Sequence, residues 1–224
     1  MEILFLNSVE STHTYLKDYI KENGYSSPIA VVTNNQTNGI GSRDNKWNGK
    51  SNNLFFSFVI DRKLLPDDLP IQSYSIYFSF ILKDLLNKLE SHVWLKWPND
   101  FYLIDKKIGG TITNISNKLV YCGIGLNKNY IDDDYGYLDI KINDKDLLLS
   151  YFKQIEKKPT WKRIFSKYTL EFENSKQYKT TIENKKVSLK NANLNDDGSI
   201  TINNKKVFSL RWLKLLQSQI KKVE

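Results

Sequence analysis

The spacing of apolar residues divides the first 174 positions into strands, helices and one long polar loop. Runs rich in β-branched and aromatic residues predict strands at 2–6, 29–33, 54–60, 93–97, 101–104, 108–115 and 119–126. Apolar residues three and four positions apart predict helices from Ser11 or Thr12 to Gly24, within 67–90, and at 144–157 and 160–174. Residues 34–53 are polar and rich in Gly and Asn, and a loop of this length is typical of a functional or disordered segment.

The pattern changes near residue 175. Beyond it the sequence predicts short strands at 178–182, 186–191, 199–203 and 205–210, with turns at Asn184 and Asp197-Gly198. Several short strands in succession favour a small barrel. We therefore expect two domains, residues 1–174 and residues 175–224.

Composition is that of a globular protein and argues against several other classes. Of the 224 residues, 40% are apolar and 13% are aromatic, which is ample material for a core. The most apolar helical stretch, residues 76–86, is interrupted by Lys83 and Asp84, so no membrane span is expected. The N-terminus lacks the basic start of a secretory signal, and the single cysteine, Cys122, cannot form an intrachain disulfide. These features predict a cytoplasmic protein.

The net charge of +8 is concentrated at the C-terminal end. Residues 174–224 contain eleven Lys and Arg against four Asp and Glu, a net charge of +7. Such asymmetry favours a surface for an acidic partner, and a solvated lysine-rich face is the alternative. A basic nucleic-acid-binding protein is a further alternative, in which Tyr178, Phe208 and Trp212 would stack on bases, although the lysines are scattered.

Two segments combine turn residues with groups that suit phosphate. GIGSRDNKW, residues 39–47, frees backbone N–H groups at its glycines and adds the bidentate donor Arg43. KWPND, residues 96–100, projects an amine, an amide and a carboxylate from a proline turn, a set that suits a metal–nucleotide complex. An ordinary turn is the alternative for both segments, with Asn99 and Asp100 bonded to their own backbone in the second.

Two further segments place glycines beside polar side chains. DKKIGG, residues 105–110, puts Lys107 before a bare stretch of strand, where its amine can reach a ligand oxygen. GIGLN, residues 123–127, leaves one strand face open for a flat group and ends in Asn127, which can read a base edge. The alternatives are a solvated hairpin tip for the first segment and close strand packing for the second.

Other reactive residues do not predict a site. His13 and His92 have no second histidine at ligand spacing, so zinc is not expected. Cys122 lies within an apolar strand, which favours inert burial. The acidic run at 132–134 lacks the calcium-loop pattern and reads as a solvated loop.

In this order the segments resemble the catalytic domain of biotin protein ligases. The family series is Ser-Thr-Asn at a helix start, a G-R-G-R-x-G-R-x-W loop, KWPND, D-x-K-[IL]-[AG]-G and G-[IA]-G-x-N. It stands here as Ser11-Thr12-His13, GIGSRDNKW, KWPND, DKKIGG and GIGLN. The resemblance is close over about residues 8–127 and looser over the basic C-terminal module. It implies an α+β fold with a mixed β-sheet and helices, followed by a small SH3-like β-barrel.

The resemblance also implies a two-step reaction. Biotin and MgATP form biotinyl-5′-adenylate and pyrophosphate, and a lysine of an acidic biotin carboxyl carrier protein then takes the biotinyl group and releases AMP. ATP and Mg²⁺ are the implied cofactors, with the metal carried by the nucleotide rather than fixed by the protein. No membrane contact and no specific DNA binding are expected, and the chain is expected to be a monomer or a homodimer.

Position in the motifs implies three sets of residues. Catalytic roles fall on Lys107, Arg43 and Asp100. Biotin contacts are implied for Ser11, Thr12, His13, Gln36, Ile40, Gly41, Ser42, Gly110 and Lys107. ATP contacts are implied for Gly39, Gly41, Arg43, Trp47, Lys96, Asn99 and Asn127.

The sequence departs from the family pattern at the first two motifs. His13 stands where the family has Asn, and Ile40 and Ser42 stand where it has Arg. Lipoate or octanoate ligases and transferases of the same fold are the enzymatic alternative. They would be expected to carry a basic segment rich in Ser and Gly at residues 39–47, and none is present.

Overall fold

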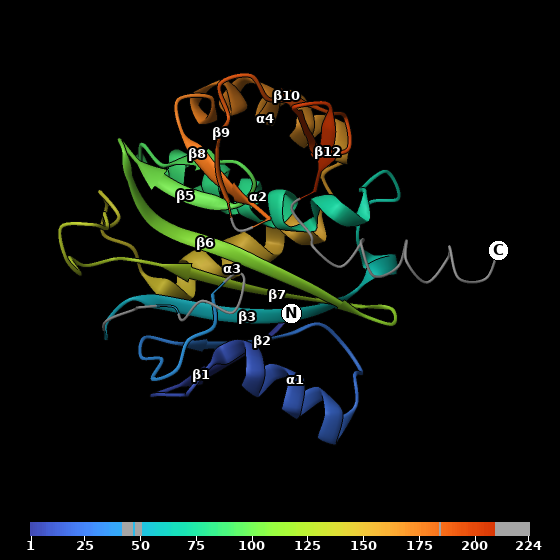
Figure 1. The fold of residues 1–224 in the computed structure, drawn as a ribbon. Coiled ribbons are helices and arrows are strands. Elements are labelled where there is room, and N and C mark those ends of the chain that lie inside the picture. Colours follow the sequence, from blue (N-terminus) through green and yellow to red (C-terminus); the bar gives the residue numbers. More distant parts are fainter. Residues whose placement is uncertain (42–46, 48–50, 184, 209–224) are drawn as a thin grey trace.

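A computed structural model describes residues 1–41, 47, 51–183 and 185–208 of the chain. One seven-stranded sheet forms the centre, with strand order β1-β2-β3-β7-β6-β5-β4 (Figure 1). The strands are β1 (Glu2–Leu6), β2 (Ile29–Thr33), β3 (Leu54–Asp61), β4 (Trp94–Lys96), β5 (Asp100–Leu103), β6 (Lys106–Ser116) and β7 (Leu119–Leu126). β1 pairs with β2 in parallel and the other pairs are antiparallel, so the expected mixed sheet is confirmed.

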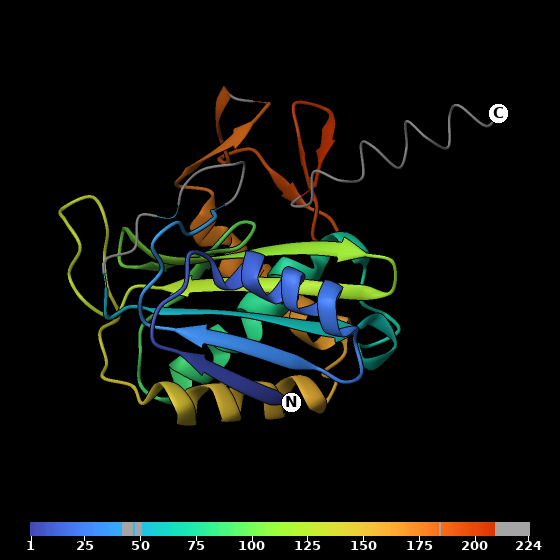
Figure 2. The same ribbon diagram turned by 90° about the horizontal axis from the view of Figure 1, so that it is seen from below.

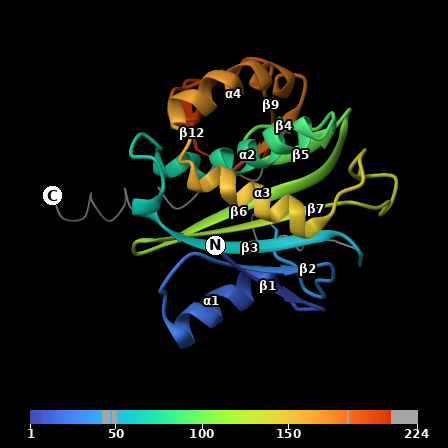
Figure 3. The ribbon, with the colours of Figure 1, turned by 180° about the vertical axis from the view of Figure 1, so that it is seen from behind.

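Helices cover both faces of this sheet. On one face lies α1 (Thr12–Asn23), as Figure 2 shows. On the other lie α2 (Tyr74–Lys88) and α3 (Asp144–Glu156), with α4 (Trp161–Ser175) beside the β4 edge (Figure 3). Two short 3-10 turns, η2 (Arg62–Leu64) and η3 (Ile71–Ser73), lie between β3 and α2 along the chain. The arrangement is a helix–sheet–helix sandwich with its larger core under α2 and α3.

The central strands β3 and β7 are mostly apolar because they are buried on both faces. Phe56 and Phe58 of β3 meet Tyr151 of α3 edge to face. Val59, the residue after Phe58, points to the other face and packs in the cluster that contains Leu16 of α1. Successive side chains of a strand alternate between faces, so one apolar run supplies both layers.

Residues 179–207 form two small sheets that pack on the main body. The hairpin of β8 (Lys179–Ile182) and β9 (Lys185–Ser188) is followed by a three-stranded sheet of β10 (Asn193–Leu194), β11 (Ile200–Ile202) and β12 (Lys205–Val207). The indole N–H of Trp97 donates to the Gly198 carbonyl at 2.9 Å, and that of Trp161 donates to the Asp196 carbonyl at 2.7 Å. The turn between β10 and β11 is therefore anchored to the main body.

Element boundaries differ from the sequence prediction where prolines or short strands intervene. The helix within 67–90 begins only at Tyr74, because Pro66 and Pro70 precede it and the chain first makes a 3-10 turn. Strand β10 was not predicted. The turn at Asn184 and the end of the last predicted strand, at 209–210, lie outside the described residues. Within the described ranges, no helix is both long enough and apolar enough to span a bilayer.

Candidate active site

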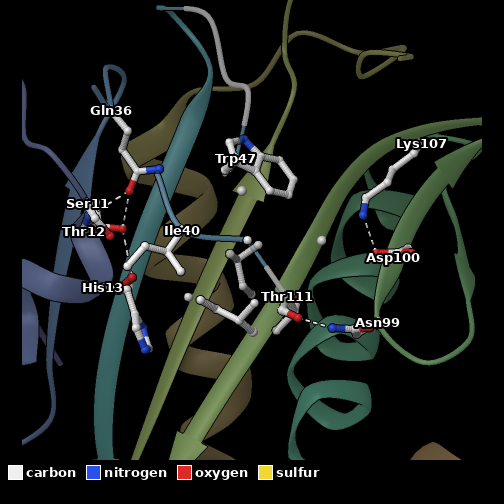
Figure 4. A pocket seen from close by; sticks show the side chains of 17 residues that line it. Ser11, Thr12, His13, Gln36, Ile40, Trp47, Asn99, Asp100, Lys107 and Thr111 are labelled. Carbon is white, nitrogen blue, oxygen red and sulfur yellow. Dashed lines mark hydrogen bonds and ion pairs between the residues drawn. The ribbon is translucent and has the colours of Figure 1, made fainter. Parts of the chain in front are cut away.

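A pocket lies on the α1 face of the sheet, beyond the N-terminal end of α1 (Figure 4). The start of α1 forms one wall, β3, β7 and β6 form the floor, and the ends of β5 and β6 form the opposite wall. The structure brings most of the predicted site residues together here. They are Ser11, Thr12, His13, Gln36, Ile40, Gly41, Trp47, Asn99, Asp100, Lys107 and Gly110.

The first turn of α1 supplies hydrogen-bonding groups to the pocket. The Ser11 hydroxyl oxygen caps the helix by accepting from the Thr14 N–H at 3.4 Å. Thr12 donates both its N–H and its hydroxyl to Gln36 Oε1, at 2.8 and 3.0 Å. Because Oε1 accepts both bonds, the amide nitrogen of Gln36 must face away from Thr12, and it points toward the pocket in Figure 4.

Glycines form the floor because neighbouring strands place them side by side. Gly110 of β6 is directly opposite Gly125 of β7, and Gly123 of β7 is opposite Ile112. A Cβ added to Gly125 would lie 2.8 Å from the Trp47 ring, which is closer than atoms approach. The indole of Trp47 therefore rests on the bare backbone of β7, where the sequence predicted room for a flat group.

Trp47 is held against this floor by a backbone hydrogen bond and a cation–π contact, and not through its indole N–H. Its backbone N–H donates to the Gly39 carbonyl at 2.8 Å. The ammonium of Lys107 lies 5.8 Å from the centre of a Trp47 ring, within the range of a cation–π contact. The indole N–H is buried and has no hydrogen-bond partner among the described residues. A ligand that lies over the paired residues Gly110 and Gly125 must displace this ring.

The opposite wall holds an ion pair. The Lys107 ammonium is 2.6 Å from Asp100 Oδ1, and both side chains are about one quarter exposed, at 29% and 23%. Lys106, the preceding residue, is exposed, whereas Lys107 faces the pocket. The alternation of side chains on a strand accounts for the difference between the two lysines.

Three predicted nucleotide contacts are placed differently from one another. Asn99 lines the pocket and donates its amide N–H to the Thr111 carbonyl. Lys96 is buried outside the pocket lining, where its ammonium lies 3.2 Å from the Tyr102 hydroxyl and 5.9 Å from the centre of the Tyr178 ring. Asn127 is also buried outside the lining and donates to the Gly136 carbonyl at 3.1 Å. The structure does not bring these last two side chains to the pocket surface.

The glycine loop is described only in part. Gly39 lies next to the pocket, and a Cβ added to it would be 2.8 Å from the Gln36 amide nitrogen. Ile40 and Gly41 line the pocket, and the Ile40 side chain is 44% exposed. Arg43 and Ser42, predicted as phosphate and biotin contacts, lie outside the described residues.

His13 is buried at the inner end of the pocket. Its Nε2 is 2.7 Å from Asn114 Oδ1 of β6, a residue 101 positions away. Its Nδ1 is buried and has no partner within the part of the chain that the structure describes. Burial lowers the pKa of His13 to about 4, helped by the nearby positive charge of Lys17. The imidazole is therefore neutral at physiological pH.

Several lining residues were not predicted. They are Ser57, Thr111, Ile112, Gly123, Ile124 and Gly125. Gly123 and Gly125 belong to the GIGLN segment, for which the sequence predicts an open strand face. Ser57 has a weaker signal, a single hydroxyl within the apolar run LFFSFVI.

The described residues that line this pocket include neither a metal-binding cluster nor a cysteine. Among the described residues, no group of three or more His, Cys, Asp and Glu side chains is arranged to hold a metal ion. Cys122 is fully buried, and burial raises the pKa of its thiol, as expected for an inert residue.

The chain belongs to the biotin/lipoate A/B protein ligase family, whose sequence pattern matches residues 5–129. The fold is shared with a biotin acetyl-coenzyme A carboxylase synthetase from Helicobacter pylori, solved with bound biotinylated ATP. That chain is 40% identical, the alignment covers 92% of this chain and 99% of that one, and the TM-score is 0.88. The α+β fold implied by the sequence is thereby confirmed.

Two curated relatives are similar to this chain over about half of its length. The bifunctional ligase/repressor BirA of Salmonella typhimurium is 30% identical over 132 residues, which cover 56% of this chain. Biotin–protein ligase 2 of Arabidopsis thaliana is 34% identical over 149 residues, which cover 55% of this chain. The matched region spans 40% and 44% of the length of these two relatives. A lipoate-protein ligase A shares the fold at 14% identity and a TM-score of 0.51.

Proposed function

We propose that this protein is a biotin–protein ligase that activates biotin with MgATP and transfers it to a lysine of a carboxyl carrier domain. The observation that carries the proposal is that the polar start of α1, the glycine floor of β6 and β7, and the Lys107–Asp100 pair converge on one pocket. The Helicobacter relative, whose structure contains biotinylated ATP, has the same fold over its whole length.

In the first step a carboxylate oxygen of biotin attacks the α-phosphorus of ATP and pyrophosphate leaves. Negative charge accumulates at the carboxylate and the α-phosphate, so a fixed cation at that point stabilises the transition state. Lys107 is the described cation that lines the pocket. Arg43 and the backbone of Gly39 and Gly41 are proposed to hold the phosphates, and Mg²⁺ is proposed to arrive bound to ATP.

The ring of biotin is proposed to lie at the α1 end of the pocket. Ser11, Thr12 and Gln36 offer hydroxyl and amide groups there, and Gly110 allows the backbone of β6 to approach the ligand. Ile40, Gly41 and Ser42 would close over it, and Trp47 would move off the floor. The adenylate would then run across the glycines toward Asn99 and Lys107.

In the second step the ε-amine of the acceptor lysine attacks the acyl carbon of the adenylate and AMP leaves. The amine must lose a proton, and Asp100 is the carboxylate on the pocket wall that can accept it. The proposed partner is an acidic carboxyl carrier domain. Residues 175–224 are proposed to form a separate small basic domain that binds this partner. The reaction is proposed to take place in the cytoplasm. Lys96 and Asn127 are proposed as nucleotide contacts in a ligand-bound state in which the segments that bury them have moved.

The experiment is direct. The protein is incubated with biotin, MgATP and a carboxyl carrier domain, and the carrier is weighed by mass spectrometry. A gain of one biotinyl group that requires ATP supports the proposal. Replacement of biotin by lipoate is the control for the related activity. A carrier left unmodified with biotin but modified with lipoate would overturn the assignment.

A further inference from the structure

The turn between β5 and β6, residues 104–105, presents an apolar side chain from a strained backbone. Ile104 has a φ of +55° and is 82% exposed. A β-branched residue rarely adopts a positive φ, because its side chain then crowds its own backbone. Among the residues that the structure describes, Ile104 is the only apolar side chain with a positive φ, and it is also the most exposed of the large apolar residues.

Neighbouring rings hold this turn in place without burying Ile104. The indole N–H of Trp94 donates to the Ile104 carbonyl at 3.0 Å. The centre of the Trp94 ring lies 5.3 Å from that of Tyr102 and 5.3 Å from that of Tyr178. The backbone of the turn is thus fixed, while its side chain points away from the core. Strain that a rigid surrounding maintains is typical of a functional position.

The turn is close to the end of the pocket where the second step is proposed to occur. Ile104 is four residues from Asp100 and three from Lys107, the ion pair on the pocket wall. Four residues of a strand span roughly 13 Å. An interface of standard size covers about 800 Å² on each partner, a disc of roughly 16 Å radius. A domain that brings a lysine to Asp100 through such an interface therefore extends as far as Ile104.

The segment that follows β7 lies beside this turn and adds aromatic and acidic groups. The Gly136 N–H donates to the Lys107 carbonyl at 3.0 Å, and the segment and the turn lie at the same end of the sheet (Figure 1, Figure 2). Tyr130 and Tyr137 are each about half exposed, with ring centres 6.5 Å apart. The acidic run at 132–134 is exposed between them. Apolar groups and negative charge together suit a partner that presents a cation beside apolar side chains.

We propose that Ile104 is a docking contact for the acceptor domain, and that it packs against an apolar residue beside the acceptor lysine. The proposal rests on the proposed function, since the lysine that approaches Asp100 is the cation that the acidic run attracts. Burial of Ile104 in the complex removes its apolar surface from water. Because Trp94 fixes the turn beforehand, docking requires little ordering of this contact.

The test replaces Ile104 by a residue that tolerates the same backbone. Asn adopts a positive φ more readily than Ile, so Ile104→Asn should be at least as stable to urea as the unaltered protein. We expect its KM for a carboxyl carrier domain to rise about 5- to 10-fold, the scale for loss of an apolar anchor. Pyrophosphate exchange should be unchanged, because Ile104 is outside the pocket lining. Mass spectrometry of the carrier at several concentrations gives KM.

Three controls separate docking from chemistry and from a general surface effect. Ile104→Val keeps a β-branched apolar side chain and should hold KM within about twofold. Leu149→Gln makes a similar change at a half-exposed residue of α3, on the opposite face of the sheet, and should leave KM unchanged. Hydroxylamine, a small nucleophile that needs no docking surface, should take the biotinyl group from the adenylate equally fast in Ile104→Asn and in the unaltered protein.

The outcomes distinguish this proposal from the proposed function. An unchanged KM in Ile104→Asn, with an unaltered protein that does biotinylate the carrier, would overturn the docking contact and leave the proposed function intact. Equal losses in pyrophosphate exchange, hydroxylamine transfer and carrier transfer would place the effect inside the pocket and would also overturn it. An unaltered protein that modifies no carrier with biotin would overturn the proposed function, and this proposal with it.

Discussion

The ammonium of Lys107 lies 2.6 Å from Asp100 Oδ1, so the pocket cation is paired with a carboxylate before any ligand arrives. The second oxygen of Asp100 is 3.9 Å from the ammonium of Lys96. One carboxylate therefore lies between two lysines, one in the pocket and one buried behind it. An anionic ligand that draws Lys107 toward itself leaves Asp100 available for another cation, such as an acceptor amine.

The first prediction concerns Lys107 and its neighbour. Lys107→Ala should lower adenylate formation by roughly 10²-fold or more, the scale for loss of one preorganised donor to a transition state. Lys106→Ala should have little effect, because that side chain is exposed and outside the pocket lining. Biotin-dependent exchange of pyrophosphate into ATP measures both. A larger loss in Lys106→Ala would show that the motif lysine has been assigned wrongly.

The second prediction separates the two steps at Asp100. Asp100→Asn keeps the shape of the side chain but removes its charge and its capacity to take a proton. We expect transfer from preformed biotinyl-adenylate to a carrier lysine to slow by roughly 10²-fold, the scale of general base catalysis. Pyrophosphate exchange should fall much less. Single-turnover transfer and exchange, measured on the same preparation, give the ratio, and an equal loss in both would refute the assigned role.

The third prediction concerns the turn that anchors the C-terminal strands. A Cβ on Gly198, whose φ is +72°, would lie 2.5 Å from Ser73 Oγ and 2.9 Å from Ile76 Cδ1. Gly198→Ala should therefore reduce the free energy of unfolding by about 2–4 kcal/mol, from backbone strain and steric overlap together. Gly24→Ala is the matched control, because Gly24 has a similar φ of +75° with no atom within 4 Å. It should cost about 1 kcal/mol, and equal losses in urea denaturation would exclude the packing contribution.

The fourth prediction follows from the pKa of His13, which burial lowers from 6.5 to about 4. Between these values the unfolded chain binds more protons than the folded one, so the free energy of unfolding falls as the pH falls through this window. The contribution is on the order of 3 kcal/mol. His13→Asn removes the titrating group, and its stability should decline less between pH 7 and pH 4. Parallel stability curves for the two proteins would contradict the neutral buried imidazole.

The fifth prediction tests the basic C-terminal surface. Lys185, Lys186 and Lys205 are exposed, whereas Lys206 is paired with Asp197 at 2.7 Å and is left unchanged. Reversal of the three exposed charges should slow transfer to an acidic carrier several-fold at low salt, because attraction between the two surfaces speeds their encounter. The difference should shrink at high salt. A fall in adenylate formation without a fall in transfer would place the effect in the pocket instead.

Much of the site was predictable because the motifs are local and each forms one turn or strand. The sequence placed Lys107 before Gly109 and Gly110, and the structure has Lys107 and Gly110 in the pocket. What the sequence did not reveal depends on contacts between distant segments. Asn114 contacts His13, a residue 101 positions away, and the sequence around neither residue indicates this hydrogen bond.

Burial by later segments also escaped prediction. The sequence predicts a phosphate contact for Lys96, and the structure places its ammonium 5.1 Å and 5.9 Å from the ring centres of Tyr102 and Tyr178. The sequence predicts a base contact for Asn127, and the structure has its amide donate to the carbonyl of Gly136, where the chain folds back. In the fold itself, β10 was not predicted because a strand of two residues is too short to show an alternation of apolar and polar positions.

The anchoring of the turn at Asp196–Ser199 bears on how the protein melts. Trp97, in the middle of KWPND, gives its indole hydrogen to Gly198, and Ser73 donates its hydroxyl hydrogen to the Asp197 carbonyl. Removal of residues 176–224 would leave that indole without its acceptor and uncover part of the apolar core. Although the composition changes sharply at residue 175, the two regions should unfold together as one cooperative unit, visible as a single calorimetric transition.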